Sequence, residues 1–192
     1  DSKTMFYTGK DEQTLRSDKI FRHSLGENQD DDKLVYEEKD ETFSTFVYPS
    51  KSREYIMIGS SSTMSTEYRF LSSKTPLDPF KIIQKRERGL EYSPSHVGDM
   101  FYISTNLNES TNFKLVKTPI SSTEKSNWKD VIPHREDVLI EDTDFFNDFM
   151  VIGERSNGLL KIRIKSWDGK EDYYLDLSSQ FDFENETYSA SI

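Results

Sequence analysis

Three histidines are the side chains in this chain best suited to metal binding or acid–base chemistry: His23, His96 and His134. They are separated by 73 and 38 residues, and none has a second ligand at the short spacing typical of a metal site. We therefore expect structural or surface roles for all of them. The chain contains no cysteine, which excludes a thiolate nucleophile and a disulfide framework.

A serine-rich segment at residues 59–63 (GSSST) is the nearest approach to a nucleophile motif. The nucleophile elbow of serine hydrolases is Gly-x-Ser-x-Gly on a turn from a strand to a helix, and the second glycine is missing here. The sequence also lacks a glycine-rich loop of the kind that holds a phosphate. We therefore predict no catalytic residue, no metal ligand and no cofactor for this chain.

The formal net charge is −10, which argues against nucleic acid as a partner because that role needs clustered Lys and Arg. Part of the charge is concentrated at residues 30–32 and 37–41. Two interpretations stay open for these segments: a solvated acidic surface, or a field that attracts basic peptides. No apolar run approaches the roughly 20 residues that span a bilayer. The cellular compartment, cytoplasmic or periplasmic, stays undecided.

A short apolar strand recurs along the chain, and it must position any functional residue. Aligning Phe6, Ile56, Phe101 and Met150 gives steps of 50, 45 and 49 residues. This interval is the size of a four-stranded β-propeller blade, and no stretch has the periodicity of a long amphipathic helix. The sequence therefore predicts an all-β, antiparallel propeller. Because aromatic residues make up 13% of the chain, we expect a core built from Phe and Tyr.

Each interval divides into four expected strands, and we expect both ends of the chain to interrupt a repeat. The incomplete first blade, residues 1–40, has expected strands at 4–8, 19–25 and 34–37. The three complete blades are expected at 41–86 (strands 42–48, 55–60, 67–71, 80–83), 87–134 (90–97, 100–105, 112–117, 128–132) and 135–180 (138–146, 149–153, 160–164, 173–177). Residues 181–192 would begin a further blade, with a strand at 187–190. We therefore interpret the chain as part of one longer propeller domain.

Two patterns refine this assignment. Apolar and basic residues alternate in Leu160-Lys161-Ile162-Arg163-Ile164 and in Tyr68-Arg69-Phe70. This is the half-buried pattern, and it predicts that the third strands are more exposed than the second strands. The pairs Asn157-Gly158 and Asp168-Gly169 are typical of type I′ hairpin turns, since both central residues of that turn have positive φ.

Several segments, in order along essentially the whole chain, resemble the propeller domain of the oligopeptidase B branch of the prolyl oligopeptidase family. They are residues 21–26 (FRHSLG), 35–43 (VYEEKDETF), 59–63 (GSSST), 128–139 (WKDVIPHREDVL) and 154–158 (ERSNG). The resemblance implies a seven-bladed propeller, of which this chain holds about four blades. It also implies that the propeller caps an α/β-hydrolase domain, absent from this chain, that carries the Ser, Asp and His of a serine peptidase. None of those catalytic residues lies in this region.

Blade topology predicts which loops would meet that hydrolase domain. Loops between second and third strands share one face, the first rim, with the connections from each outer strand to the next blade. We expect residues 59–63, 85–89, 133–137 and 154–158 there, and residues 72–76, 118–122 and 165–170 on the opposite face. Arginine can bind carboxylates in a bidentate fork across an interface. The candidate interdomain and substrate-gating residues are Arg86, Glu87, Arg88, Arg135, Glu136, Glu154 and Arg155. The alternative is that these are ordinary solvated loop charges.

Two classes of function follow, with a third kept open. The first, implied by the resemblance, is the non-catalytic gating portion of a serine oligopeptidase that cleaves short peptides after basic residues. The second is a free-standing propeller that binds a ligand or protein through its rim. A propeller glycosidase would need acidic residues converging near the axis, for which Glu91, Asp142 and Asp144 are available. For the isolated chain we expect no activity and self-association through its terminal blades.

Overall fold

The computed structural model of the chain describes residues 3–176, which form four antiparallel sheets. We call these sheets blades 1 to 4. Blade 1 contains β1 (Thr4–Lys10), β2 (Ser17–Ser24) and β3 (Lys33–Glu37). Blade 2 contains β4 (Ser44–Pro49), β5 (Tyr55–Ser61), β6 (Thr66–Ser72) and β7 (Lys81–Gln84).

The two following blades repeat the same order. Blade 3 contains β8 (Tyr92–Val97), β9 (Met100–Thr105), β10 (Lys114–Pro119) and β11 (Lys129–Ile132). Blade 4 contains β12 (Leu139–Phe145), β13 (Phe149–Ser156), β14 (Leu159–Ser166) and β15 (Asp172–Tyr174). Helical structure in the described part of the chain is limited to the short 3-10 turns Gln29–Asp31 and Lys125–Asn127.

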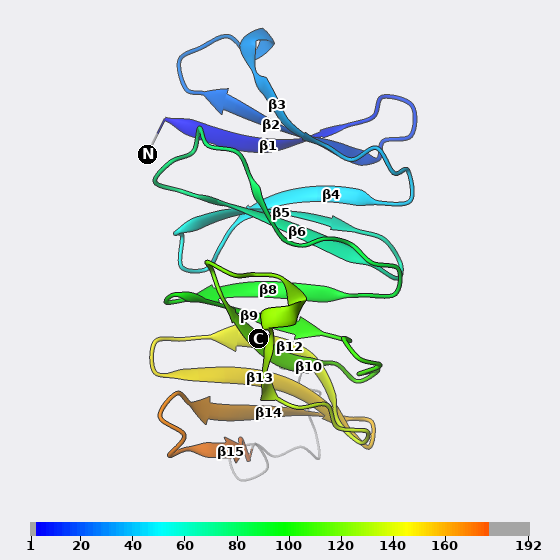
Figure 1. Ribbon diagram of the computed structural model, residues 1–192, viewed down its shortest axis with the longest axis vertical. Helices are drawn as coiled ribbons and strands as arrows, with labels where there is room; N and C mark the ends of the chain where they lie inside the picture. The colour runs from blue at the N-terminus through cyan, green and yellow to red at the C-terminus, as the bar shows by residue number, and fades with distance from the viewer. Residues whose placement is uncertain (1–2, 177–192) are drawn as a thin grey trace, which may run out of the picture.

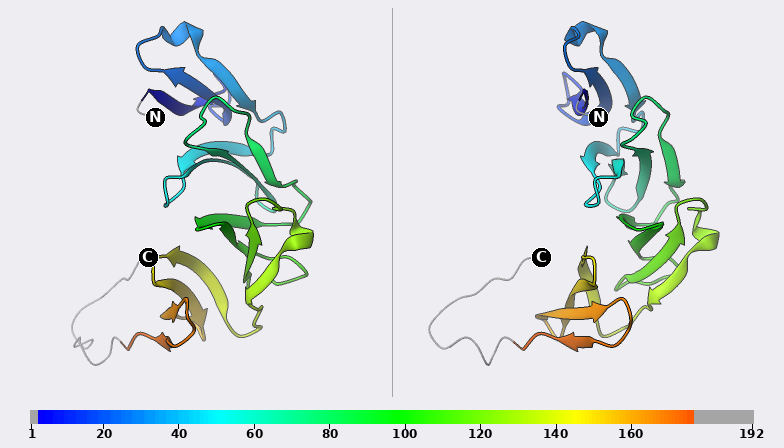
Figure 2. Two further views of the ribbon diagram at one scale, coloured as in Figure 1. Left: turned by 60° about the vertical axis from the view of Figure 1, so that its left-hand side comes forward. Right: turned by 90° about the vertical axis from the view of Figure 1, so that its left-hand side faces the viewer.

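In every blade the strands pair with their neighbours in sequence, so each sheet is a meander (Figure 1). The four blades follow a curved path, with the first strands β4, β8 and β12 on its concave side, as both views of Figure 2 show. The prediction of an all-β, antiparallel propeller fragment with four-stranded blades is therefore confirmed, and blade 1 contains three strands within the described residues. The further strand expected at 187–190 lies outside the described residues, and the exact blade boundaries stay a prediction.

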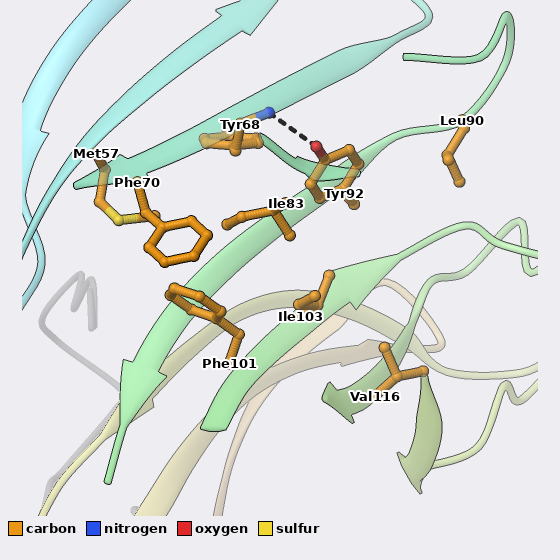
Figure 3. Packing of buried hydrophobic residues seen from close by; sticks show 9 residues of the cluster. All are labelled: Met57, Tyr68, Phe70, Ile83, Leu90, Tyr92, Phe101, Ile103 and Val116. Atoms are coloured by element: carbon orange, nitrogen blue, oxygen red, sulfur yellow. Dashed lines mark hydrogen bonds between the residues drawn. The ribbon is translucent and has the colours of Figure 1, made fainter. Parts of the chain in front are cut away.

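An aromatic core joins blade 2 to blade 3 (Figure 3). The rings of Phe70 and Phe101 meet edge to face with centroids 5.1 Å apart. Tyr92 lies in the same core, and its hydroxyl accepts a hydrogen bond from the Tyr68 amide at 2.8 Å. Burial raises the pKa of Tyr92 above its ordinary value, since the phenolate would be poorly solvated there. Tyr68, Phe70, Tyr92 and Phe101 are four of the nine buried residues of this cluster, and the other five are aliphatic or Met. The expectation of a core built from Phe and Tyr instead of many aliphatic residues is therefore wrong.

The interface between blades 3 and 4 is more aliphatic. Its buried residues are Leu115, Ile132, Ile140, Phe145, Met150 and Ile152. Trp167 and Tyr102 extend this cluster, with ring centroids 5.1 Å apart. Because both surfaces of a middle blade are covered in this way, its second strand is apolar at nearly every position.

The strand of blade 1 is misplaced in the alignment of the four apolar strands. Phe6 contacts Phe80 of the following blade, with ring centroids 5.7 Å apart, whereas Phe101 contacts Phe70 of the preceding blade. Because successive side chains of a strand point to opposite sides, Phe6 is out of register with Phe101 by an odd number of residues. The alignment failed here because every position in these strands is apolar, so hydropathy alone could not fix the register.

Candidate functional site

The first rim is the edge of the arc along which the chain passes from one blade to the next. The connections at residues 38–43, 85–91 and 133–138 all lie there, on the right in Figure 1. The β5–β6, β9–β10 and β13–β14 loops share the same edge. The loops at residues 50–54, 98–99 and 146–148 lie on the opposite edge, which we call the second rim. This arrangement is the one expected for up-and-down blades.

Glu154 is the most completely enclosed charged residue among those predicted for the rim, with a relative exposure of 0%. Its carboxylate forms an ion pair with Arg135, from the connection that leads into blade 4. Arg163 donates a hydrogen bond to the same carboxylate at 3.3 Å, and the Tyr174 hydroxyl donates another to it at 2.6 Å. Burial opposes ionisation, but these donors outweigh it and hold the pKa of Glu154 below its usual value.

A second cluster surrounds Arg86 between blades 1 and 2. Its guanidinium donates to the Glu38 carboxylate at 2.5 Å and lies 3.4 Å from that of Glu67. It also stacks over the Phe43 ring, 4.0 Å from the centroid. Burial disfavours the charged form of Glu38, yet the hydrogen bonds from Arg86 and Tyr36 prevail, and the pKa of Glu38 is lowered. Arg86 therefore links the connection that leaves blade 1 to the connection that leaves blade 2.

Two further arginines belong to these clusters, and both lie on third strands that were expected to be more exposed. Arg69 pairs with Ile58 in the register of blade 2, and Arg163 pairs with Ile152 at the equivalent place in blade 4. Their side chains are only 15% and 19% exposed. Arg69 contacts Glu67 at 2.6 Å and lies over the Tyr36 ring. The alternating pattern of the third strands thus reflects charges enclosed between blades and does not mark a face open to water.

The remaining predicted residues lie further out on the first rim. Arg155 is 43% exposed and holds Glu141 through two hydrogen bonds, at 2.5 and 3.1 Å. Glu87 pairs with Lys125 at 2.5 Å. Arg88 and Glu136 are exposed. The structure therefore separates the seven candidates into two groups: Arg86, Arg135 and Glu154 are engaged between blades, while Glu87, Arg88, Glu136 and Arg155 form the outer surface.

The three histidines and Ser60 of the serine-rich segment form hydrogen-bond contacts with other residues of the propeller. His23 binds Asp32 through Nδ1 at 2.7 Å, and His96 lies 2.7 Å from the Ser52 hydroxyl. His134 Nε2 accepts a hydrogen bond from the backbone amide of Asn112 at 3.4 Å. Ser60 is fully buried on β5, 3.0 Å from the Tyr36 hydroxyl. A buried strand position differs from the exposed turn that a nucleophile elbow requires.

The acidic residues considered for a glycosidase do lie near the axis. Asp142 and Asp144 are on the inner strand β12, and Glu91 precedes β8. Asp144 is paired with Lys51 at 2.5 Å, and Glu91 accepts a hydrogen bond from Asn106 at 3.3 Å. Because two of the three carboxylates are engaged by side chains of the propeller, the pattern gives no support to a pair of acid and base catalysts.

The acidic segments are not uniformly solvated. Asp30 and Asp31 are exposed, whereas Asp32 and Glu38 have side chains only 6% and 4% exposed. Asp32 receives hydrogen bonds from Tyr7 and His23 at 2.7 Å, so its role lies in holding the turn after β2.

Within residues 3–176, no group of three His, Cys, Asp or Glu side chains is arranged to hold a metal ion. The same residues include no helix long and apolar enough to cross a membrane.

Comparison with known proteins agrees with this architecture. A sequence profile described as "Prolyl oligopeptidase, N-terminal beta-propeller domain" matches residues 1–191. The dipeptidyl aminopeptidase BI of Pseudoxanthomonas mexicana is 40% identical over 90% of this chain and 24% of its own length. Protease 2 of Moraxella lacunata is 33% identical over 82% of this chain and 22% of its own length.

Solved structures give the same result. Oligopeptidase B from Leishmania major superposes with a TM-score of 0.81 and 31% identity, covering 86% of this chain and 23% of that chain. Oligopeptidase B from Trypanosoma brucei, in a closed form with covalently bound antipain, superposes with a TM-score of 0.82 and 28% identity. This match covers 91% of this chain and 24% of that chain. The chain thus spans about a quarter of the length of these relatives.

The fold and the rim define a portion of a β-propeller whose blades are linked by charge clusters. The chain belongs to the prolyl oligopeptidase family, as part of its N-terminal β-propeller domain. The resemblance noted in the sequence is therefore confirmed.

Proposed function

We propose that this chain is the non-catalytic, substrate-gating portion of a serine oligopeptidase that cleaves short peptides after basic residues. The match of residues 1–191 to the propeller domain of this family carries the proposal. The relatives described above are named as peptidases and are about four times as long, which leaves room for a catalytic domain outside the matched region.

The topology supports docking of that catalytic domain on the first rim. The chain enters and leaves each complete blade on this edge, so a domain that precedes or follows the propeller in sequence is linked there. The outer group of rim residues, Glu87, Arg88, Glu136 and Arg155, offers exposed charges of both signs for an interface. Arg86 and Arg135 have a different part in this proposal, since they shape the rim by fixing one blade to the next.

Substrate preference can be tested on the full-length protein with fluorogenic peptides that differ only in the residue before the scissile bond. We expect a kcat/KM for Arg or Lys at least 100-fold above that for Ala or Pro, because a site built for a charged group rejects a neutral one strongly. Equal rates for all four substrates, or a preference for Pro, would contradict cleavage after basic residues. Labelling by a serine-directed phosphonate reports the reaction class separately.

A further inference from the structure

The hairpin between β13 and β14 carries an asparagine–glycine pair at its tip. Ser156 and Leu159 are the last residues paired in the ladder, so Asn157 and Gly158 form the two-residue turn. Their φ angles are 52° and 80°, both in the left-handed region, as a type I′ turn requires. Both residues are exposed, and the hairpin tip lies on the first rim (Figure 1).

An asparagine side chain that precedes glycine can react with the backbone, because glycine has no Cβ to hinder the approach. The Gly158 nitrogen lies outside the strand ladder, and a Cβ built on this residue would meet no atom within 4 Å. Its attack on Asn157 forms an N–Cγ bond and breaks the Cγ–Nδ2 bond, and ammonia leaves with the amide proton. Water then opens the succinimide ring at either carbonyl, which leaves aspartate or isoaspartate at position 157.

The folded turn keeps the reacting atoms apart. In a type I′ turn, the nitrogen of the second central residue lies on the far side of the Cα–C bond from the side chain of the first. Asn157 must therefore leave the left-handed region before the Gly158 nitrogen can reach Cγ. The rate of reaction then depends on how often the turn opens, and so on the contacts that hold it.

Arg155 supplies the contact that holds this turn. Its Nη1 donates a hydrogen bond to the Gly158 carbonyl at 3.0 Å. Its Nε and Nη2 donate to the Glu141 carboxylate, on β12, at 2.5 and 3.1 Å. One guanidinium thus ties the hairpin tip to the neighbouring strand. Because hydrogen bonds from a charged donor are stronger than neutral ones, this link opposes rotation of the turn.

We propose that Asn157 is a site of spontaneous deamidation, and that Arg155 and Glu141 slow the reaction by clamping the turn. The product adds a negative charge to the first rim, two positions from Arg155. Isoaspartate also lengthens the backbone of a turn that sets the register of β13 and β14. The reaction needs only the turn and water, so this inference does not depend on the proposed function.

Deamidation can be measured by incubating the full-length protein at mildly alkaline pH and mapping its peptides by mass spectrometry. Arg155→Ala removes the clamp, and we expect Asn157 to be lost about fivefold faster than in the wild type, the factor that one hydrogen bond contributes to a turn-opening equilibrium. The wild-type protein unfolded in urea gives the rate without any turn and should react fastest. Asn157→Gly tolerates the same backbone conformation and should give no product at this position.

Lys161→Ala is the matched control. Lys161 is an exposed cation of the same hairpin, but it lies over the Tyr174 ring, 5.7 Å from its centroid, and should leave the rate unchanged. Equal rates for the wild type and Arg155→Ala would overturn the clamp, as would a folded wild type that reacts as fast as the unfolded chain. An intact Asn157 in both folded proteins, while the unfolded chain reacts, would overturn the modification site.

Discussion

Arg135, in the connection that leaves blade 3, forms an ion pair with Glu154, whose side chain is completely buried in blade 4. The pair places a charge–charge contact beside a propeller seam whose buried residues are mostly aliphatic. Arg163 and Tyr174 complete the hydrogen bonding of the carboxylate. A buried carboxylate with this many donors fixes the position of the connection relative to the blade that follows.

Removing that carboxylate is expected to destabilise the propeller strongly. Glu154→Gln leaves Arg135 without its counter-charge, whereas Arg163 keeps its ion pair with Asp172. Loss of one partner of a buried pair costs about 3–5 kcal/mol. Urea unfolding of the full-length protein, followed by tryptophan fluorescence, measures the change. The control is Glu141→Gln, whose pair with Arg155 is exposed and is worth less than about 1 kcal/mol. Equal losses for the two variants would contradict the account of this seam.

The same residue predicts a pH dependence. The pKa of Glu154 is lowered in the folded state from its ordinary value of 4.5, so the stability it contributes is fully present above that value. This contribution is lost as the pH falls through the lowered folded-state pKa. Asp172 contributes to stability with the same pH dependence, because the hydrogen bond from Arg163 lowers its pKa from 3.8 to about 2. Urea midpoints measured from pH 7 down to pH 3 should fall less steeply for Glu154→Gln than for the wild type. A parallel fall would show that Glu154 does not titrate in this way.

The strands could be predicted almost completely from the sequence, whereas the charge clusters could not. Repeated apolar segments and Asn157-Gly158 fix the positions of strands and hairpins locally, within each repeat. Glu38 and Arg86 are 48 residues apart and meet only because consecutive blades pack side by side. The third strands that carry Arg69 and Arg163 were expected to be more exposed, because an alternating strand gives no sign of what covers its second face. The recurrence of arginine at the same third-strand position in blades 2 and 4 was the available signal.

The first rim can be tested by charge reversal in the outer group. Arg88→Glu and Arg155→Glu in the full-length protein should alter domain closure and lower kcat/KM for peptides at least fivefold, while the unfolding midpoint changes little. Arg86 and Arg135 are unsuitable for this test, because their reversal would place like charges against Glu38 and Glu154. Lys74→Glu and Lys170→Glu, on the second rim, are the controls. Equal effects from both pairs of variants would remove the assignment of the docking face.

The isolated chain is expected to self-associate. Large apolar side chains are exposed on the terminal blades, including Met5 and Leu34 on blade 1 and Leu160 and Tyr173 on blade 4. Exposed apolar surface of this kind favours association. Light scattering over a concentration series should give an apparent mass that rises with concentration, and Tyr173→Asp should weaken the rise. A monomer at all concentrations, with blades 1 and 4 in contact, would contradict this expectation.

The most direct test of the central claim compares hydrolysis by the full-length protein with hydrolysis by this 192-residue chain alone. Both are incubated with a fluorogenic peptide ending in Arg and with a serine-directed phosphonate. We predict turnover and covalent labelling of the full-length protein, and neither for the isolated chain. Among its described residues Ser52 lies 2.7 Å from His96, but the other ring nitrogen of His96 has no hydrogen-bond partner that would orient it as a base. Turnover by the isolated chain that survives repurification, or a full-length protein without peptidase activity, would contradict the assignment of this propeller as the gating portion of a serine oligopeptidase.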